Sequence, residues 1–460
     1  ERAAAAAEAV VRIETALARA SMSLVDRREP SNLYHVMTRR AFEALAPSFD
    51  WESYFTALAA PPFERLNVRV PGFFRALESL LRTVPLEDWK SYLRWQLARG
   101  WSPFLTRTLV EEDFAFYGRT LRGTRELSPR WRRCVRFTDA LLGEALGKPY
   151  VEKALGEQGK RRTLEMVQAL EAALREDITG LPWMTEATRK QALAKLAAIT
   201  NKIGYPDTWR DYGAVDIVRG DLPGDTSRGR AFEFHRWLDK IGKPVDRGEW
   251  LMSPPTVNAY YDPQMNNINF PAGILQPPFF DRHADDAVNY GGIGVVIGHE
   301  LTHGFDDQGR QFDAQGDLRD WWTPRDAQGF DERAACFVKE YGSFTAVDDV
   351  RLDGRLTLGE NVADNGGLRI AYAALRQALA AHPEPPIDGF TPEQRFFISD
   401  AQVWCANVSD AFARLLAQTN AHSLPRYRVN GVVSNMPEFR AAFSCSEGSP
   451  MVRREPCRVW

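Results

Sequence analysis

The residues with the clearest potential for chemistry form a short motif, GHELTH, at positions 298–303. In a helix, His299 and His303 are four residues apart, a little more than one turn, so both imidazoles lie on one face. Two neutral imidazoles at this spacing are good zinc ligands, and Glu300 beside them could deprotonate a water molecule held by the metal. A buried pair of structural histidines is the alternative that the motif alone leaves open.

A catalytic zinc site needs a third protein ligand besides the two histidines. The metzincin pattern would place another histidine six residues after His303, but that position is Gly309. The other arrangement takes a glutamate from a second helix, and Glu360, in the sequence GENVAD, fits it. We therefore predict one zinc ion per chain, bound by His299, His303 and Glu360.

Two aspartates are candidates for orienting the histidine ligands. Asp364 follows Glu360 by four residues and shares its helix face, and Asp306 follows His303 by three. Each carboxylate could accept the remaining ring N–H of a ligand histidine and so fix its tautomer. Taken alone, an acidic pair such as Glu360 and Asp364 is more typical of a solvated helix face, and it gains weight only as the partner of the first motif.

The pattern along the chain changes in the middle. Residues 1–20 form an alanine-rich helical pattern, and helical periodicity dominates from about residue 28 to 205. Glycine, proline and aspartate then crowd into residues 204–225, which indicates a boundary. Short strand-like pieces follow at 256–261 and 267–270, two helices carry the motifs, and residues 428–433 in the tail read as a strand. An apolar, glycine-containing run at 291–298 would bury the first motif helix and allow close packing.

Composition excludes several classes of protein. The chain has 460 residues, 44% of them hydrophobic and 26% charged, with a net charge of −3. These values are ordinary for a globular protein and argue against a dedicated nucleic-acid binder, which would show a basic excess. No apolar stretch near the motifs approaches the roughly 20 residues that a membrane span needs. The abundance of arginine and alanine favours a bacterial source.

Five cysteines are present, and none forms a C-x-x-C pair, so a zinc ribbon or a thioredoxin-type motif is not indicated. Because the number is odd, either the thiols are reduced and buried, or some of them pair with a segment outside this sequence. The five are Cys134, Cys336, Cys405, Cys445 and Cys457.

Several motifs together resemble the neprilysin family of zinc metallopeptidases, the gluzincins that include the endothelin-converting enzymes. They occur in the family's order: NAYY at 258–261, then 298–309, 360–367, 422–428 and CRVW at 457–460. The resemblance implies a mainly α, two-domain neprilysin-like fold. A thermolysin-like catalytic domain, with a small β-sheet plus helices, and a helical lid domain would enclose a central cavity.

The resemblance also implies domain limits. Residues 1–21 would be the end of a helix belonging to the catalytic domain, 22–225 the helical lid and 226–460 the zinc catalytic domain. Full-length relatives carry roughly two hundred further residues before this chain begins. We therefore expect the chain to lack the family's amino-terminal part, present as a missing or separate segment, and Cys336 to pair with Cys457. Disulfides and the family imply an extracellular, periplasmic or envelope-attached location.

Carried over by position, the family's roles fall on residues around the motifs. Asn258 and Ala259 would bind the substrate backbone in an extended form, and Arg428 would contact a substrate carbonyl. His422 would stabilise the transition state, with Glu300 as general base and Asp364 as a further catalytic residue. A pocket for a large apolar P1′ residue would be lined by Ile274, Phe279, Val296, Val403 and Trp404. Without the family context these five would be ordinary core residues.

The implied function is a zinc-dependent metalloendopeptidase that hydrolyses short peptides. Two alternatives remain from the sequence. One is a catalytically inactive, peptide-binding relative, and the other is a carboxydipeptidase-type specificity. The retention of His299, Glu300, His303 and Glu360 argues against the inactive alternative.

Overall fold

The structure is a computed structural model that describes residues 2–460 and divides into two compact units. Among the described residues, one unit contains those up to Phe137 together with Asp211–Asp246, and the other contains Thr138–Arg210 and Arg247–Trp460. These limits differ from those expected at residues 21 and 225. The reason is that residues 138–210 pack with the carboxy-terminal half of the chain. How the units correspond to a lid and a catalytic domain stays a prediction.

The first unit is helical apart from one small two-stranded sheet. Its helices are α1 (Arg2–Ala20), α2 (Arg39–Glu43), α3 (Trp51–Ala57), α4 (Pro71–Thr83), α5 (Leu86–Trp101), α6 (Arg107–Asp113), the start of α7 (Arg130–Ala154) and α10 (Leu222–Leu238). Strands β1 (Val36–Thr38) and β2 (Arg65–Asn67) pair antiparallel. Short 3-10 turns lie at Asp26–Arg28, Pro30–Leu33 and Ser102–Phe104, and a π-helical turn at Phe114–Thr120.

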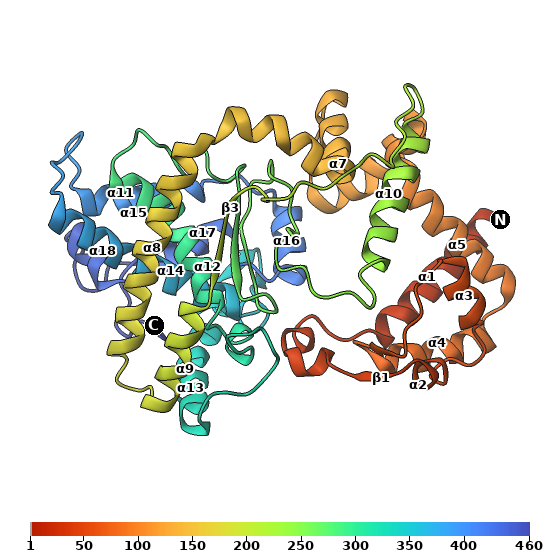
Figure 1. Ribbon diagram of the computed structural model, residues 1–460, viewed down its shortest axis with the longest axis horizontal. Helices are drawn as coiled ribbons and strands as arrows, with labels where there is room; N and C mark the ends of the chain where they lie inside the picture. Colours follow the sequence, from red (N-terminus) through yellow and green to blue (C-terminus); the bar gives the residue numbers. More distant parts are fainter. Residues whose placement is uncertain (1) are drawn as a thin grey trace. The chain divides into compact units, whose positions relative to one another are not determined.

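Helix α1 packs against α4 and α5 inside the first unit (Figure 1). Alanine-rich sequence explains the helix itself, and Val10 and Ile13 supply the side that is buried. The sequence analysis assigned this helix to the catalytic domain, whereas its contacts group it with residues of the first unit.

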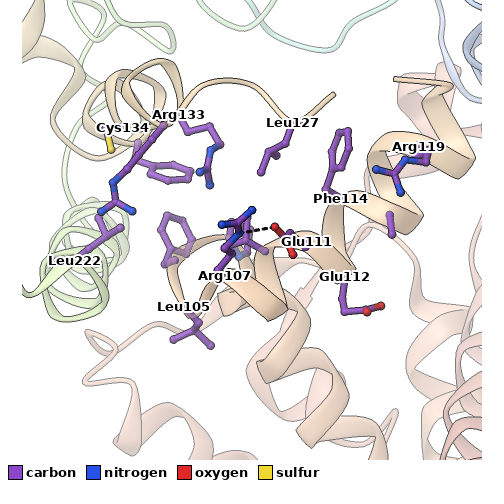
Figure 2. Close-up of a pocket in the computed structure, with 16 residues that line it drawn as sticks. Leu105, Arg107, Glu111, Glu112, Phe114, Arg119, Leu127, Arg133, Cys134 and Leu222 are labelled. Carbon is purple, nitrogen blue, oxygen red and sulfur yellow. Dashed lines mark hydrogen bonds and ion pairs between the residues drawn. The ribbon is translucent and has the colours of Figure 1, made fainter. Parts of the chain in front are cut away.

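A cavity of about 630 Å³ lies within the first unit (Figure 2). Apolar side chains such as Phe114 and Leu127 line it together with the guanidinium groups of Arg119 and Arg133. Its lining among the described residues includes none of those that the sequence predicts for the metal site. This cavity therefore plays no part in the site described below.

The second unit contains the remaining elements. Its helices are the end of α7, α8 (Gly156–Gly180), α9 (Glu186–Ala197), α11 (Asp286–Asn289), α12 (Val295–His303), α13 (Pro324–Tyr341), α14 (Leu358–Ala381), α15 (Pro392–Val403), α16 (Asp410–Thr419), α17 (Pro425–Val433) and α18 (Pro437–Ala442). A π-helical turn at Tyr290–Gly294 leads into α12, and a 3-10 turn at Gly309–Gln311 follows it. The strands are β3 (Thr200–Gly204), β4 (Tyr260–Asp262), β5 (Asn267–Pro271), β6 (Thr345–Val347) and β7 (Val350–Arg351).

Strands β3, β5 and β4 form a three-stranded sheet in that order. The central strand β5 pairs parallel with β3 and antiparallel with β4, and all five of its residues are buried. This pairing joins Thr200–Gly204 to the second unit. Of the two predicted strand-like pieces, the one at 267–270 is confirmed, and the one at 256–261 is reduced to Tyr260–Asp262.

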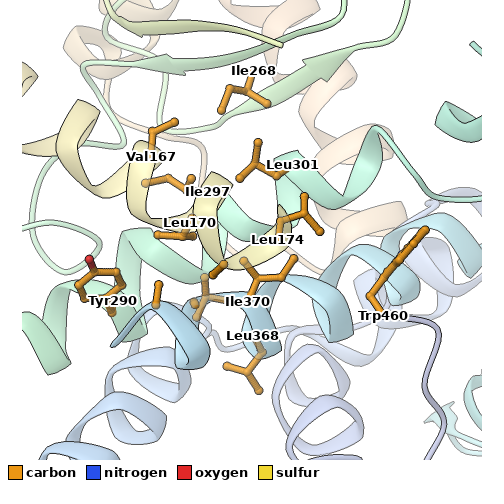
Figure 3. Close-up of a cluster of buried hydrophobic side chains, with 14 of the residues drawn as sticks. Val167, Leu170, Leu174, Ile268, Tyr290, Ile297, Leu301, Leu368, Ile370 and Trp460 are labelled. Carbon is orange, nitrogen blue, oxygen red and sulfur yellow. The ribbon is translucent and has the colours of Figure 1, made fainter. Parts of the chain in front are cut away.

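The core of the second unit lies where α8 packs against α12 and α14 (Figure 3). Leu170 and Leu174 of α8 meet Ile297 and Leu301 of α12, and all four are at most 1% exposed. Helix α12 is buried nearly all round, since seven of its nine residues are buried, including the polar His299, Glu300 and Thr302. A buried helix of this kind holds its polar side chains in fixed positions.

Helices α12 and α14 approach each other through glycines. A Cβ atom added at Gly298 would lie 2.6 Å from the carbonyl oxygen of Gly367, and one added at Gly367 would lie 2.5 Å from the amide nitrogen of His299. Only glycine allows the two backbones to be this close. The close contact brings Glu360 of α14 to the histidines of α12.

The tail differs from the sequence prediction. Residues 428–433 are helical, in α17, and not a strand. Pro425 opens this helix at its first turn, and Gly431, Val432 and Val433 are buried. A short apolar run cannot by itself be distinguished between strand and helix, and here the packing against α13 and α14 decides.

Cys336 of α13 forms a disulfide with Cys457 of the tail, as the resemblance implied. The two Cα atoms are 5.6 Å apart. Within residues 2–460, no helix combines the length and apolar character needed to cross a bilayer.

Candidate metal centre and active site

The imidazoles of His299 and His303 face each other from consecutive turns of α12. Their Nε2 atoms are 2.9 Å apart, and the two rings are nearly perpendicular. Glu360 of α14 brings its Oε2 atom to 3.3 Å from His299 Nε2 and 3.5 Å from His303 Nε2. These three residues form a group that could hold a metal ion.

Each histidine also has a carboxylate at its other nitrogen. Asp364 Oδ1 lies 2.8 Å from His299 Nδ1, and Asp306 Oδ2 lies 2.7 Å from His303 Nδ1. A carboxylate at Nδ1 favours the tautomer that carries its proton there. In the neutral rings, both Nε2 lone pairs then point at one another and at the Glu360 oxygen, an arrangement that a bound cation would stabilise.

The donor set fits a zinc ion. Two imidazole nitrogens and one carboxylate oxygen are the protein ligands of a catalytic zinc site that leaves one position open. The carboxylates of Asp306 and Asp364 complete the outer hydrogen bonds that such ligands require. Both aspartates are buried, at 3% and 5% exposed, so solvent does not compete for them.

Glu300 lies next to His299 on α12 and lines the same cavity. Its side chain is buried, and this burial raises the pKa of its carboxyl group, although the nearby His299 and His303 act in the opposite direction. The pKa of Glu360 shifts in the opposite direction. Burial would raise its pKa, but the charges of His303 and His422 outweigh burial and hold that pKa well below its ordinary value.

His422 and Arg428 reach the site from the segment at the start of α17. His422 Nε2 lies 3.2 Å from Glu360 Oε2, and its Nδ1 lies 2.9 Å from Asn420 Oδ1. Arg428 forms two hydrogen bonds with Asp364, and its guanidinium carbon lies 3.9 Å above the ring of Trp404. The pKa of Asp364 is lowered because Arg428 and His299 outweigh its burial.

His299, His303 and Glu360 line a cavity of about 500 Å³ in the second unit. Most of the residues that the sequence analysis assigned to substrate binding line this cavity: Asn258, Ala259, Ile274, Phe279, Val296, Trp404 and Arg428. Val403 does not line it. Val403 is the last residue of α15, and its neighbour Trp404 is the one that lines the cavity.

The sequence analysis missed several residues that line the same cavity. They are Met252, Val257, Tyr260, Tyr261, Pro263, Val295, Gln308 and Gly309. Adjacency was the available signal, because Tyr260 and Tyr261 directly follow Asn258 and Ala259, and Gln308 and Gly309 close the segment after the histidine motif. Met252 and Pro263 offered no such signal, since only the chain path in space brings them there.

Comparison with known proteins gives a consistent picture. Residues 258–459 match peptidase family M13, and residues 1–206 match a second description of the same family, for its amino-terminal part. The expectation that the chain lacks this amino-terminal part is therefore wrong as regards residues 1–206, which match it. The resemblance to the neprilysin and endothelin-converting-enzyme family is confirmed.

Relatives of known function cover nearly the whole chain. It is 37% identical to endothelin-converting enzyme 1 of Bos taurus over 98% of its length, and it spans 62% of the length of that relative. Among solved structures, the zinc metalloprotease Zmp1 of Mycobacterium tuberculosis in complex with inhibitor is 44% identical, with a TM-score of 0.96 over 99% of this chain and 71% of that one. PepO of Lactobacillus rhamnosis is 29% identical, with a TM-score of 0.89 over 98% of this chain and 70% of that one.

Proposed function

Because the chain belongs to peptidase family M13, we propose that it carries the active site of a zinc-dependent endopeptidase that hydrolyses short peptides. The single observation that carries this proposal is the convergence of His299, His303 and Glu360 beside Glu300 in one cavity. Two of the relatives named above, endothelin-converting enzyme 1 and the zinc metalloprotease Zmp1, support the same activity.

His299, His303 and Glu360 would hold one zinc ion. A zinc ion bound there supplies a Lewis acid that polarises a peptide carbonyl and makes water a stronger acid. Asp364 and Asp306 keep the protons of the two histidines on Nδ1, so that both Nε2 atoms stay available as ligands.

Glu300 acts as the general base. Its carboxylate takes a proton from the attacking water molecule and later delivers it to the leaving amine of the product. Burial raises the pKa of Glu300, which makes its carboxylate a stronger base than an exposed one. No covalent intermediate with the protein is needed.

His422 and Arg428 serve the substrate carbonyl. His422 Nδ1–H donates a hydrogen bond to the Asn420 oxygen, so donation from Nε2 as well requires the doubly protonated ring. In that form Nε2 can donate to the oxygen that becomes negative in the transition state. Arg428 is held by Asp364 and lies over the ring of Trp404, and it lines the same cavity, where its remaining N–H groups would contact a substrate carbonyl.

Substrate preference follows from the cavity lining. Ile274, Phe279, Val296 and Trp404 present apolar surface, which suits a large hydrophobic residue at P1′. Asn258 and Ala259 precede β4, an edge strand of the three-stranded sheet. An extended peptide could pair with the backbone there as an added strand.

The disulfide between Cys336 and Cys457 supports a location outside the reducing cytoplasm. We propose an extracellular, periplasmic or envelope-attached protein. Thiol labelling of protein isolated from its source under denaturing conditions tests this: these two cysteines should be protected until a reductant is added. Labelling of both without reductant would contradict it.

The function is tested by measuring zinc content together with cleavage of quenched peptides. A peptide with Phe or Leu at P1′, blocked at both ends, should be cleaved, and one with Asp at P1′ should be cleaved far more slowly. Glu300→Gln should retain one zinc per chain and lose activity by a factor of about 10²–10⁴. The exposed His382→Gln is the matched control and should cleave like the wild type.

Different outcomes separate the alternatives. Failure to bind zinc would contradict the ligand assignment. Zinc binding without cleavage of any peptide would favour the inactive, peptide-binding alternative. Cleavage only of peptides with a free carboxyl terminus, two residues from the end, would replace the endopeptidase assignment with a carboxydipeptidase.

A further inference from the structure

Lys195 is a buried lysine on α9, only 1% exposed. Lysine is seldom buried to this degree, and a buried ammonium group must have hydrogen-bond partners. Its Nζ atom donates to the carbonyl oxygens of Gly309, at 2.6 Å, and Phe312, at 2.7 Å. Both carbonyls belong to the segment that follows the metal-binding helix α12.

The same segment carries Asp306, which contacts a metal ligand. Gly309 N–H donates to Asp306 Oδ1 at 2.6 Å, and Asp306 Oδ2 lies 2.7 Å from His303 Nδ1. Lys195 therefore donates to the carbonyl oxygen of Gly309, and the N–H of the same Gly309 donates to Asp306. A short hydrogen-bonded path thus runs from α9 to the ring of His303.

The segment has little room to shift. A Cβ atom at Gly309 would lie 1.8 Å from the carbonyl oxygen of His303, so this segment folds back against the end of α12. Asn266 Nδ2 donates to the carbonyls of Lys195 and Ala314, which fixes the lysine backbone to the far end of the segment. A shift of Gly309 would consequently move Asp306 and change the orientation of the His303 ring.

Aromatic rings surround the lysine amine. Its Nζ lies 5.6 Å from the ring centre of Phe305, 5.8 Å from Tyr261 and 5.9 Å from Trp321. These rings favour a cation and keep water away from the two carbonyls. Without Lys195, both carbonyl oxygens would lose a buried donor that water could not readily replace.

We propose that Lys195 is a positioning residue of the metal site, which orients the His303 ring through the Gly309 carbonyl and the Asp306 carboxylate. This proposal rests on the proposed metal site. It assigns Lys195 no contact with substrate or metal. Since groups that orient a metal ligand typically change metal affinity by 10–100-fold, loss of a group one step further out should have an effect near the lower end.

The test measures zinc affinity by competition with a chromogenic chelator, for the wild type, Lys195→Met, Asp306→Asn and the double variant. Lys195→Met should raise the zinc Kd by roughly tenfold. If Lys195 acts through Asp306, the double variant should bind zinc no more weakly than Asp306→Asn alone. The absorption spectrum of the cobalt-substituted protein should change in Lys195→Met, because it reports the ligand field at His303.

Lys190→Met is the matched control, because Lys190 is an exposed lysine on the same helix. It should leave the zinc Kd and the cobalt spectrum unchanged. Should Lys195→Met fail to fold, Lys195→Gln, which keeps N–H donors, takes its place with a smaller expected rise of the Kd.

An unchanged zinc Kd in the Lys195 variants would overturn the inference, and so would effects of Lys195→Met and Asp306→Asn that simply multiply in the double variant. A wild-type protein that binds no zinc would instead overturn the proposed function, so the two failures can be told apart.

Discussion

Arg428 donates two hydrogen bonds to Asp364, from Nε to Oδ2 at 2.8 Å and from Nη2 to Oδ1 at 2.6 Å. The same Oδ1 atom lies 2.8 Å from His299 Nδ1. The side chains of both residues are less than 10% exposed, so this pair is shielded from solvent. Arg428, which the resemblance assigned to the substrate, therefore also balances the charge of the carboxylate behind a metal ligand.

Replacing Arg428 with methionine should be strongly destabilising, because it leaves the buried Asp364 carboxylate without its cation. We expect the free energy of unfolding to fall by about 3–5 kcal/mol, measured by denaturant titration. Arg428→Lys keeps the charge but loses the paired hydrogen bonds, so its free energy of unfolding should lie between those of the wild type and Arg428→Met. The control is Arg414→Met, which breaks an exposed pair with Asp348 and should change stability by less than about 1 kcal/mol. Equal losses in both methionine variants would contradict the assigned role of burial.

Substituting alanine for Gly367 should separate α12 from α14. The added Cβ would lie 2.5 Å from the amide nitrogen of His299, so the helix backbones must move apart. We expect a loss of about 1–3 kcal/mol in stability and a weaker affinity for zinc, because Glu360 shifts away from the histidines. Calorimetric melting and chelator competition measure the two effects. Gly180→Ala on α8, where a Cβ meets nothing within 4 Å, should show neither.

Removing the imidazole of His422 should impair catalysis more than metal binding. In His422→Ala, kcat/KM should fall by roughly 10²–10³, the usual effect of losing one donor to a developing oxyanion. The zinc Kd should change much less, because His422 is not one of the three residues grouped as ligands. Steady-state kinetics and chelator competition check both points, with the exposed His382→Ala as control. A loss of zinc that parallels the loss of activity would show that His422 acts on the metal site itself.

Lys195 should make stability depend on pH. Burial lowers its pKa from 10.5 to about 7 in the folded protein, although Asp306 and Asp313 oppose this shift. Between these two pKa values the unfolded chain binds the proton that the folded protein lacks, so the contribution of Lys195 to stability rises with pH. It is fully present above about pH 10.5 and lost as pH falls through about 7.

The measurement is denaturant unfolding of metal-free protein at several pH values in this window. The wild type should gain stability relative to Lys195→Met as pH rises, by at most about 1.4 kcal/mol per pH unit. Lys190→Met should parallel the wild type. If Lys195→Met also runs parallel to it, the amine does not titrate in this range.

Sequence predicted the parts of the site that local geometry controls. His299 and His303 lie on one face because a helix repeats every 3.6 residues, and Glu360 and Asp364 share a face for the same reason. The family resemblance added His422, Arg428 and the disulfide partners, which no local rule connects. Of the residues predicted for a P1′ pocket, Trp404 lies in the cavity lining and Val403 lies outside it, and the P1′ role itself stays a prediction.

Two features resisted prediction for physical reasons. The segment at 428–433 forms helix because α13 and α14 bury its apolar side, and a run of six residues carries too little periodicity to show this. Lys195 looked like any helical lysine, since nothing in its neighbourhood along the chain marks it as buried.

The sequence by itself determined which residues can bind a metal and on which helix faces they lie, because side-chain chemistry and helical period are local properties. Only the tertiary structure decided that Glu360 meets the two histidines, that Arg428 neutralises Asp364 and that Lys195 reaches Gly309. Each of these contacts joins residues that are far apart in the sequence. They form because α9, α14 and α17 pack near α12 and the segment that follows it, and no local sequence pattern encodes that packing.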